Sequence, residues 1–203
     1  MTELELESYA VGTNIAASLI QTTITLDTAA LIDAITDVLG GKETKISPED
    51  IDKHLQSFSK KIQDKQMSAM NAAAEENLAK GKEFLKANKA KEGVTVTPSG
   101  LQYEVLVQGD GEKPTAESTV VVHYAGTSIE GTEFDSSYSR GEPAQFPVGG
   151  VIPGWTEALL LMNVGSKYKL TIPSGIAYGQ QGAGQAIGPN ETLCFEVELL
   201  EIV

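Results

Sequence analysis

Glycine and proline are distributed so unevenly along this chain that they divide it into two structural parts. Residues 42–91 contain one glycine, Gly81, and one proline, Pro48, whereas beyond Gly93 both types recur every few positions. Because these residues interrupt helices and mark turns, a long stretch almost free of them favours a helix. We therefore expect a helical first half and a second half of strands and turns, joined near residues 91–93.

The long helix has a clear predicted start. Ser47 suits the N-cap position, Pro48 the first helical position, and Asp50 the acidic position of a capping box. The helical pattern then continues to about Asn88, which corresponds to roughly 60 Å of helix. An apolar stripe covers only its first turns, and the part beyond Lys65 is polar on all sides. This second part is expected to act as a spacer.

Two shorter helices are predicted before it. Val11 and Ile15 begin one apolar stripe with helical spacing, and Leu31 and Ile35 begin another, which Gly40 and Gly41 end. One alternative is that these stripes form a small helical core. The favoured alternative is a homodimer, because about 60 residues in three helices bury little surface on their own.

The charge of the chain excludes several partners. Its formal net charge is −13, which argues against nucleic acid and against an anionic membrane surface. No apolar run approaches the roughly 18 residues of a membrane span. Residues 1–41 contain no Lys or Arg, so no secretory signal is expected, and the single Cys194 forbids an internal disulfide. These features predict a cytoplasmic protein. The alternative is a periplasmic or outer-membrane-associated protein whose signal peptide is absent from the sequence.

The second half is expected to be antiparallel β-structure. Strands are predicted at residues 101–107, 118–125, 167–172 and 193–202, with a turn at Glu130 and Gly131 and one short helix at about 154–162. The short helix contains the only tryptophan, Trp155.

Familiar catalytic constellations are absent. His54 and His123 have no cysteine at metal-site spacing, and Cys194 has no evident base. The glycine-rich run 179–188 (GQQGAGQAIG) lacks the Gly-Lys-Ser/Thr of a phosphate loop and is better interpreted as a surface loop. We therefore predict no metal and no cofactor.

Six segments of the second half resemble the FKBP-type prolyl isomerases in order and spacing. They are residues 120–124 (VVVHY), 131–137 (GTEFDSS), 140–143 (RGEP), 151–155 (VIPGW), 177–179 (AYG) and 192–199 (TLCFEVEL). The first half resembles that of the bacterial two-domain members typified by the macrophage infectivity potentiator, which are dimers built on N-terminal helices.

The resemblance implies an α+β protein in three parts. These are an all-helical dimerisation region (1–46), a long connecting helix (47–92) and an isomerase domain (93–203) whose twisted antiparallel sheet wraps around one short helix. The implied activity is peptidyl-prolyl cis/trans isomerisation during protein folding. The implied partners are proline-containing unfolded or nascent polypeptides, a second copy of the chain, and the macrolide inhibitors tacrolimus and rapamycin.

The resemblance also assigns the site. The residues implied as catalytic are Tyr124, Phe134, Asp135, Trp155, Tyr178 and Phe195. The residues implied as substrate-binding are Arg140, Phe146, Val151, Ile152 and Ile187. Asp135 and Arg140 are expected to form an ion pair, because a carboxylate beside an apolar pocket is costly without a partner. Ala144 and Ala183 replace a rim aromatic residue and a histidine of eukaryotic members, which affects macrolide affinity and substrate preference.

Two other functions stay open at this point. One is a holdase-type dimeric chaperone in which isomerisation is secondary. The other is a dimeric scaffold with an inactive pocket, which the intact Tyr124, Asp135 and Trp155 disfavour.

Overall fold

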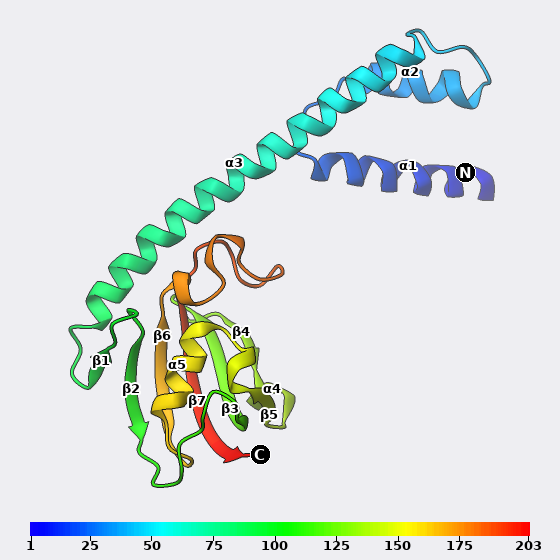
Figure 1. Ribbon diagram of the computed structural model, residues 1–203. Coiled ribbons are helices and arrows are strands. Elements are labelled where there is room, and N and C mark those ends of the chain that lie inside the picture. Colours follow the sequence, from blue (N-terminus) through cyan, green and yellow to red (C-terminus); the bar gives the residue numbers. More distant parts are fainter. The chain divides into compact units, whose positions relative to one another are not determined.

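The first half of the chain is helical, and local capping sets where each helix begins. The computed structural model describes residues 1–203. Its first helices are α1 (Glu3–Gln21), α2 (Thr28–Leu39) and α3 (Pro48–Asn88) (Figure 1). Thr2, Asp27 and Ser47 each accept a hydrogen bond from the backbone N–H three residues further on. None of the helices combines the length and the hydropathy that a membrane span requires. The predicted bounds of the long helix and the predicted stop of α2 at Gly40 are confirmed.

The apolar stripes of α1 and α2 stay on the surface of the single chain. Val11 is 61% exposed, Ile15 47% and Ile35 40%. The only buried residue of the two helices is Asp37, whose carboxylate lies 3.6 Å from the ammonium groups of both Lys42 and Lys45. The stripes therefore do not form a small helical core within one chain.

The second half is one antiparallel sheet wrapped around a short helix, which confirms the predicted α+β class (Figure 1). The strands are β1 (Val94–Val96), β2 (Gln102–Val107), β3 (Thr119–Ser128), β4 (Glu133–Ser136), β5 (Ala144–Pro147), β6 (Lys167–Ile172) and β7 (Leu193–Ile202). Their order is β1-β2-β6-β7-β3-β4, and β5 pairs with β3. The helix inside the sheet is α5 (Pro153–Leu161).

The long strands follow the sequence prediction and the short ones do not. β6 and β7 have the predicted bounds, β2 begins one residue later, and β3 extends to Ser128. β1, β4 and β5 were not predicted, because three or four residues carry too little alternation to be recognised.

α5 approaches the sheet closely because of its first residues. Pro153 occupies the first helical turn, where its missing N–H costs nothing. A Cβ atom on Gly154 would lie 2.5 Å from Cγ2 of Ile172 on β6, so only glycine permits this approach. The next residue, Trp155, is therefore pressed against the concave face of the sheet and is 5% exposed.

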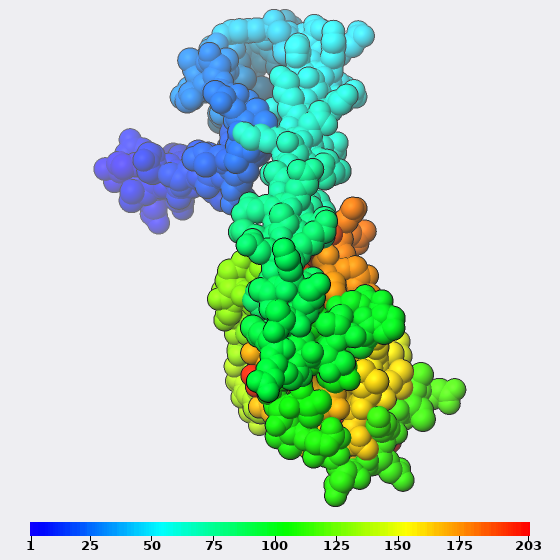
Figure 2. All heavy atoms as spheres, turned by 90° about the vertical axis from the view of Figure 1, so that its left-hand side faces the viewer, coloured from blue at the N-terminus to red at the C-terminus, as the bar shows by residue number.

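The end of α3 packs on the opposite, outer face of the sheet. Gln102 Nε2 donates to the Leu85 carbonyl (2.9 Å), and Asn88 Nδ2 lies 3.0 Å from Gln102 Oε1 and 3.3 Å from Thr171 Oγ1. Gln102, Thr171 and Cys194 are cross-strand neighbours on β2, β6 and β7, and all three are buried. Figure 2 shows the green end of the helix lying over this face.

These contacts correct the prediction that the polar part of α3 is only a spacer. Its residues form a compact unit with the sheet, Met70–Val203, which we call the C-terminal unit; the other compact unit is Met1–Ala69. The prediction failed because polar side chains that form buried hydrogen bonds have the same sequence pattern as solvated ones.

Candidate functional site

An open cavity of about 320 Å³ lies between α5 and the strands, within the size range of small-ligand sites. It is lined by Tyr124, Phe134, Asp135, Phe146, Gly150, Val151, Ile152, Trp155, Tyr178 and Phe195, and we call it the aromatic pocket.

Trp155 is the centre of its aromatic lining. The ring of Trp155 meets the rings of Tyr124 (5.2 Å), Phe146 (5.8 Å) and Phe195 (5.3 Å) edge to face. Phe134 packs on Phe195 in the same way at 5.6 Å. Edge-to-face contacts add about 0.5–1.5 kcal/mol beyond burial and hold the rings in fixed orientations. The aromatic part of the pocket is therefore preformed and apolar.

Gly126 makes room for two of these rings. It follows Tyr124 by two residues on β3 and pairs with Phe195 on β7. A Cβ atom at this position would lie 2.7 Å from ring carbons of both Phe134 and Phe195. The sequence carried a signal of this, because Gly126 continues the inward-facing positions of Val120, Val122 and Tyr124 with no side chain.

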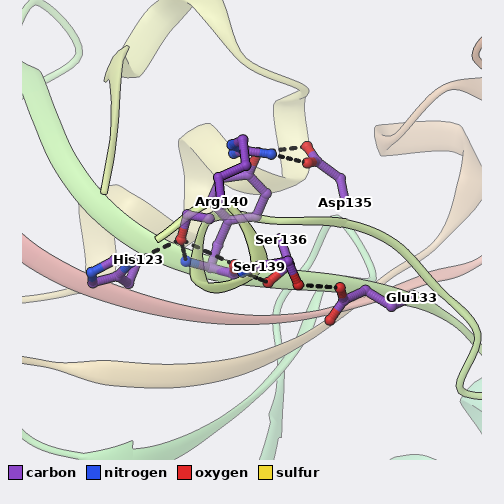
Figure 3. Close-up of polar contacts among 8 residues, drawn as sticks. His123, Glu133, Asp135, Ser136, Ser139 and Arg140 are labelled. Atoms are coloured by element: carbon purple, nitrogen blue, oxygen red, sulfur yellow. Dashed lines mark hydrogen bonds and ion pairs between the residues drawn. The ribbon is translucent and has the colours of Figure 1, made fainter. Parts of the chain in front are cut away.

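One wall of the pocket carries a polar network. The Tyr124 hydroxyl donates to Asp135 Oδ2 (2.5 Å) and accepts from Arg140 Nη2 (2.8 Å), while Arg140 Nη1 pairs with Asp135 Oδ1. Figure 3 shows the Arg140 guanidinium facing the Asp135 carboxylate. The predicted ion pair is confirmed.

The network shifts the pKa values of its members. Burial acts to raise the pKa of Asp135, but the hydrogen bonds from Tyr124 and Arg140 outweigh it and hold that pKa below its usual value. Burial and the bond to Asp135 together raise the pKa of the Tyr124 hydroxyl. Near neutral pH the wall therefore presents an ionised carboxylate and a protonated phenol.

A short helix, α4 (Ser137–Arg140), brings Arg140 into place. Ser136 caps its start by accepting from the Ser139 N–H, and Gly141 ends it in the left-handed conformation at φ 80°. The fully buried Ser137 hydroxyl accepts from the Tyr124 N–H (2.8 Å), and it lies 2.9 Å from His123 Nδ1. The helix is thus attached to the strand that carries Tyr124.

The two residues considered for other chemistry have structural surroundings. His123 stacks on Tyr138 at 4.6 Å between ring centres, on the face of β3 away from the pocket. Burial raises the pKa of the Cys194 thiol, which disfavours a reactive thiolate. No group of three or more His, Cys, Asp or Glu side chains is placed to hold a metal ion.

The structure brings most of the assigned site residues around one cavity. Two do not line it: Arg140 stands behind Tyr124 and Asp135, and Ile187 is 7% exposed within the hydrophobic core. The run 179–188 is a loop at the surface, as predicted, in which Ile187 is the one buried residue. Ala183 and Ile187 exchange backbone hydrogen bonds of 2.9 and 3.1 Å. Gly150 also lines the cavity and was not assigned from the sequence.

Comparison with known proteins agrees with this geometry. The sequence profile "FKBP-type peptidyl-prolyl cis-trans isomerase" matches residues 110–200, and "Domain amino terminal to FKBP-type peptidyl-prolyl isomerase" matches residues 5–105. The isomerase FkpA of Aeromonas hydrophila is 47% identical over 98% of this chain and 76% of its own length. The outer membrane protein MIP of Legionella longbeachae is 41% identical over 99% and 86%. The crystal structure of FkpA from Escherichia coli superposes with a TM-score of 0.81 at 39% identity, covering 99% of this chain and 97% of that one.

The chain belongs to the FKBP-type peptidyl-prolyl cis-trans isomerases. As an FKBP-type enzyme it catalyses rotation about the peptide bond before proline in polypeptide substrates. The predicted family and activity are confirmed, and the FKBP-type relatives do not favour the holdase alternative. They also give no support to the predicted cytoplasmic location, since one of them is named an outer membrane protein.

Proposed function

We propose that the aromatic pocket binds the proline of an X–Pro bond and lowers the barrier to rotation without covalent chemistry. That barrier is about 18–20 kcal/mol because rotation breaks amide resonance. The planar amide is more polar than the twisted one, so an apolar pocket penalises the planar state more. Each ~1.4 kcal/mol of such differential stabilisation speeds exchange tenfold. The observation that carries this proposal is the cavity floored by Trp155 and walled by aromatic rings.

Three polar groups at the pocket are proposed to hold the substrate backbone. The Tyr178 hydroxyl stands on a side chain that is 41% exposed, and the Ile152 N–H donates no hydrogen bond within the chain. Both are available to a substrate carbonyl. The Asp135 carboxylate, fixed by Tyr124 and Arg140, presents a negative charge beside the twisting amide.

Tyr178→Phe is expected to lower kcat/KM on an X–Pro tetrapeptide by up to about tenfold, the value of one neutral hydrogen bond. The ring is kept and is partly exposed, so thermal unfolding should not change. The control is Tyr9→Phe, which removes a phenolic hydroxyl from α1, outside the aromatic pocket. If both Tyr178→Phe and Phe134→Ala left isomerisation untouched, the aromatic pocket would not be the site.

Arg140→Ala is expected to lower activity about two- to tenfold and to lower stability, because it removes the guanidinium that donates to both Asp135 and Tyr124 and leaves Asp135 with the Tyr124 hydroxyl as its side-chain donor. Ionised Asp135 contributes stability above the ordinary carboxyl pKa, and this is lost as the pH falls through its lowered folded-state pKa. In the variant that pKa rises toward its unfolded-state value, so the acid-induced loss of stability should be smaller and should be complete at a higher pH. Denaturation midpoints measured at a series of pH values from about 3 to 7, a range that covers the titration of a carboxyl group, test this expectation.

Arg140→Lys is the matched comparison, since it keeps the charge but cannot contact Tyr124 and Asp135 with two nitrogen atoms at once. An alanine variant with unchanged activity and an unchanged pH profile would remove the ion pair from the mechanism.

We also propose that the chain is a homodimer formed through residues 1–46. The apolar side chains left exposed on α1 and α2 support this, as do exposed Val38 (61%) and Leu39 (84%). Removal of residues 1–41 should give a monomer in sedimentation experiments. Its activity on a large unfolded protein should fall by more than its activity on a tetrapeptide, because two pockets on one particle raise the effective concentration for rebinding. A full chain that sediments as a monomer would refute the proposal.

The aromatic pocket is further proposed to bind tacrolimus and rapamycin in competition with substrate. Ala144 packs against the core and Ala183 pairs with Ile187, so neither supplies a rim side chain of the size found in eukaryotic members. Titration of Trp155 fluorescence with each macrolide, with and without a tetrapeptide, tests this competition.

Cell fractionation decides between the predicted cytoplasmic location and the envelope location that the name of the Legionella longbeachae relative suggests.

A further inference from the structure

The polar end of α3 contacts the segment that leads from the glycine-rich loop into β7. Asn77 Nδ2 on α3 donates to the Pro189 carbonyl (2.9 Å). Asn190 Nδ2 contacts the Ala74 carbonyl of the helix in return (3.4 Å). Helix and segment therefore hold each other through side chains from both sides.

The same segment is hydrogen-bonded to the backbone next to Tyr178. The Asn190 N–H donates to the Gly179 carbonyl at 2.7 Å. Asn190 adopts φ 56°, a left-handed conformation that asparagine tolerates better than most residues. The chain of contacts runs from Asn77 through Pro189 and Asn190 to Gly179, and Tyr178 precedes Gly179 on the pocket rim.

Close packing supports this path. A Cβ atom on Gly81 of α3 would lie 2.3 Å from Thr192 Oγ1, and Thr192 is 5% exposed. A larger residue would push the helix away from the segment. The rim side chain of Tyr178 is 41% exposed, so its position depends on its own backbone more than on surrounding side chains.

We infer that Asn77 and Gly81 are positioning residues for Tyr178, so that the helix preceding the isomerase sheet helps to set the geometry of the aromatic pocket. Asn77 fixes the segment through Pro189, and Gly81 lets α3 approach Thr192. Asn88 attaches the same helix to the sheet through Gln102 and Thr171, with no link to Tyr178. The inference rests on the proposed role of Tyr178 in catalysis.

The test compares Asn77→Ala with Asn88→Ala in the full chain. Each removes one side-chain donor from the same face of α3. Asn77→Ala is expected to lower kcat/KM on an X–Pro tetrapeptide about two- to tenfold, while Asn88→Ala lowers stability without that loss. Asn77→Gln, which keeps the amide donor, should recover part of the activity. An equal loss in both alanine variants, or no loss in Asn77→Ala, overturns the inference.

Repeating the substitution in a chain that already carries Tyr178→Ala separates an effect on the position of Tyr178 from a general loss of stability. In a Tyr178→Ala chain, Asn77→Ala should cause no further loss, because the residue it positions is gone. The same fold loss in both backgrounds contradicts the inference. If Tyr178→Ala itself left kcat/KM unchanged, the proposed role of Tyr178 would fail first, and the two failures are distinguishable.

Gly81→Ala provides an independent perturbation. It should lower kcat/KM in the native background and have no effect on Tyr178→Ala. Gly12→Ala is the matched control, because Gly12 is also helical and nothing lies within 4 Å of the position of its Cβ. If Gly81→Ala and Gly12→Ala gave the same kcat/KM, the close approach at Thr192 would have no part in positioning the rim.

Discussion

Trp155→Ala is expected to lower the free energy of unfolding of the C-terminal unit by about 3–5 kcal/mol. Trp155 is 5% exposed and its ring contacts those of Tyr124, Phe146 and Phe195. Truncation leaves a cavity that these rings cannot fill without losing their edge-to-face contacts. Because Trp155 is the only tryptophan, unfolding in urea has to be followed by circular dichroism.

The same variant should lose most of its activity on tetrapeptides, because the floor beneath the proline ring is removed. Leu160→Ala is the control on the same helix, since Leu160 is 38% exposed and does not line the pocket. Trp155→Phe should retain more stability and activity than Trp155→Ala. A Trp155→Ala chain as stable as Leu160→Ala would contradict the packing described for α5.

The second large effect concerns where the isomerase domain is cut from the chain. We propose that residues 94–203 fold and isomerise tetrapeptides, but that Met70–Val203 is more stable by about 2–4 kcal/mol. The shorter fragment lacks the hydrogen bonds that Asn77, Leu85 and Asn88 make with the sheet and its loop, each worth about 0.5–1.5 kcal/mol. The urea midpoint of Trp155 fluorescence measures the difference.

A second measurement checks the cause. Cys194 lies in the buried row beside Thr171, and in the shorter fragment it should react faster with a thiol reagent because α3 no longer covers that row. Equal stability and equal thiol reactivity in the two fragments would show that the helix contributes nothing to the unit. The domain that begins at residue 93 would then be as stable as the longer unit Met70–Val203.

A feature of the fold was predictable from the sequence when the residues that specify it lie close together in the chain. The start of α3 was predictable because Ser47 and Asp50 hydrogen-bond to each other within one turn and Pro48 occupies the first helical position. β6 and β7 were predictable because their alternation is long. The docking of α3 was not, because Asn77 and Asn88 bond to partners 14 to 112 residues away and have no periodic pattern.

The residues of the candidate site also divide into those assigned from short motifs and those whose role depends on the folded structure. The aromatic residues and the Asp135–Arg140 pair were assigned from motifs whose spacing is short. The burial of Ile187 was missed because it depends on how the loop folds back through Ala183. The need for glycine at position 126 depends on two rings from other strands, which meet only in the folded sheet.

The position of β7 has a consequence for how this enzyme is made. β7 lies between β6 and β3, and it alone joins β1, β2 and β6 to β3, β4 and β5. During synthesis, domains generally fold as units once their parts have left the ribosome. The two halves of this sheet cannot join until residues 193–202 have emerged. A catalyst of protein folding must therefore leave its own active site incomplete until its translation has passed the last strand.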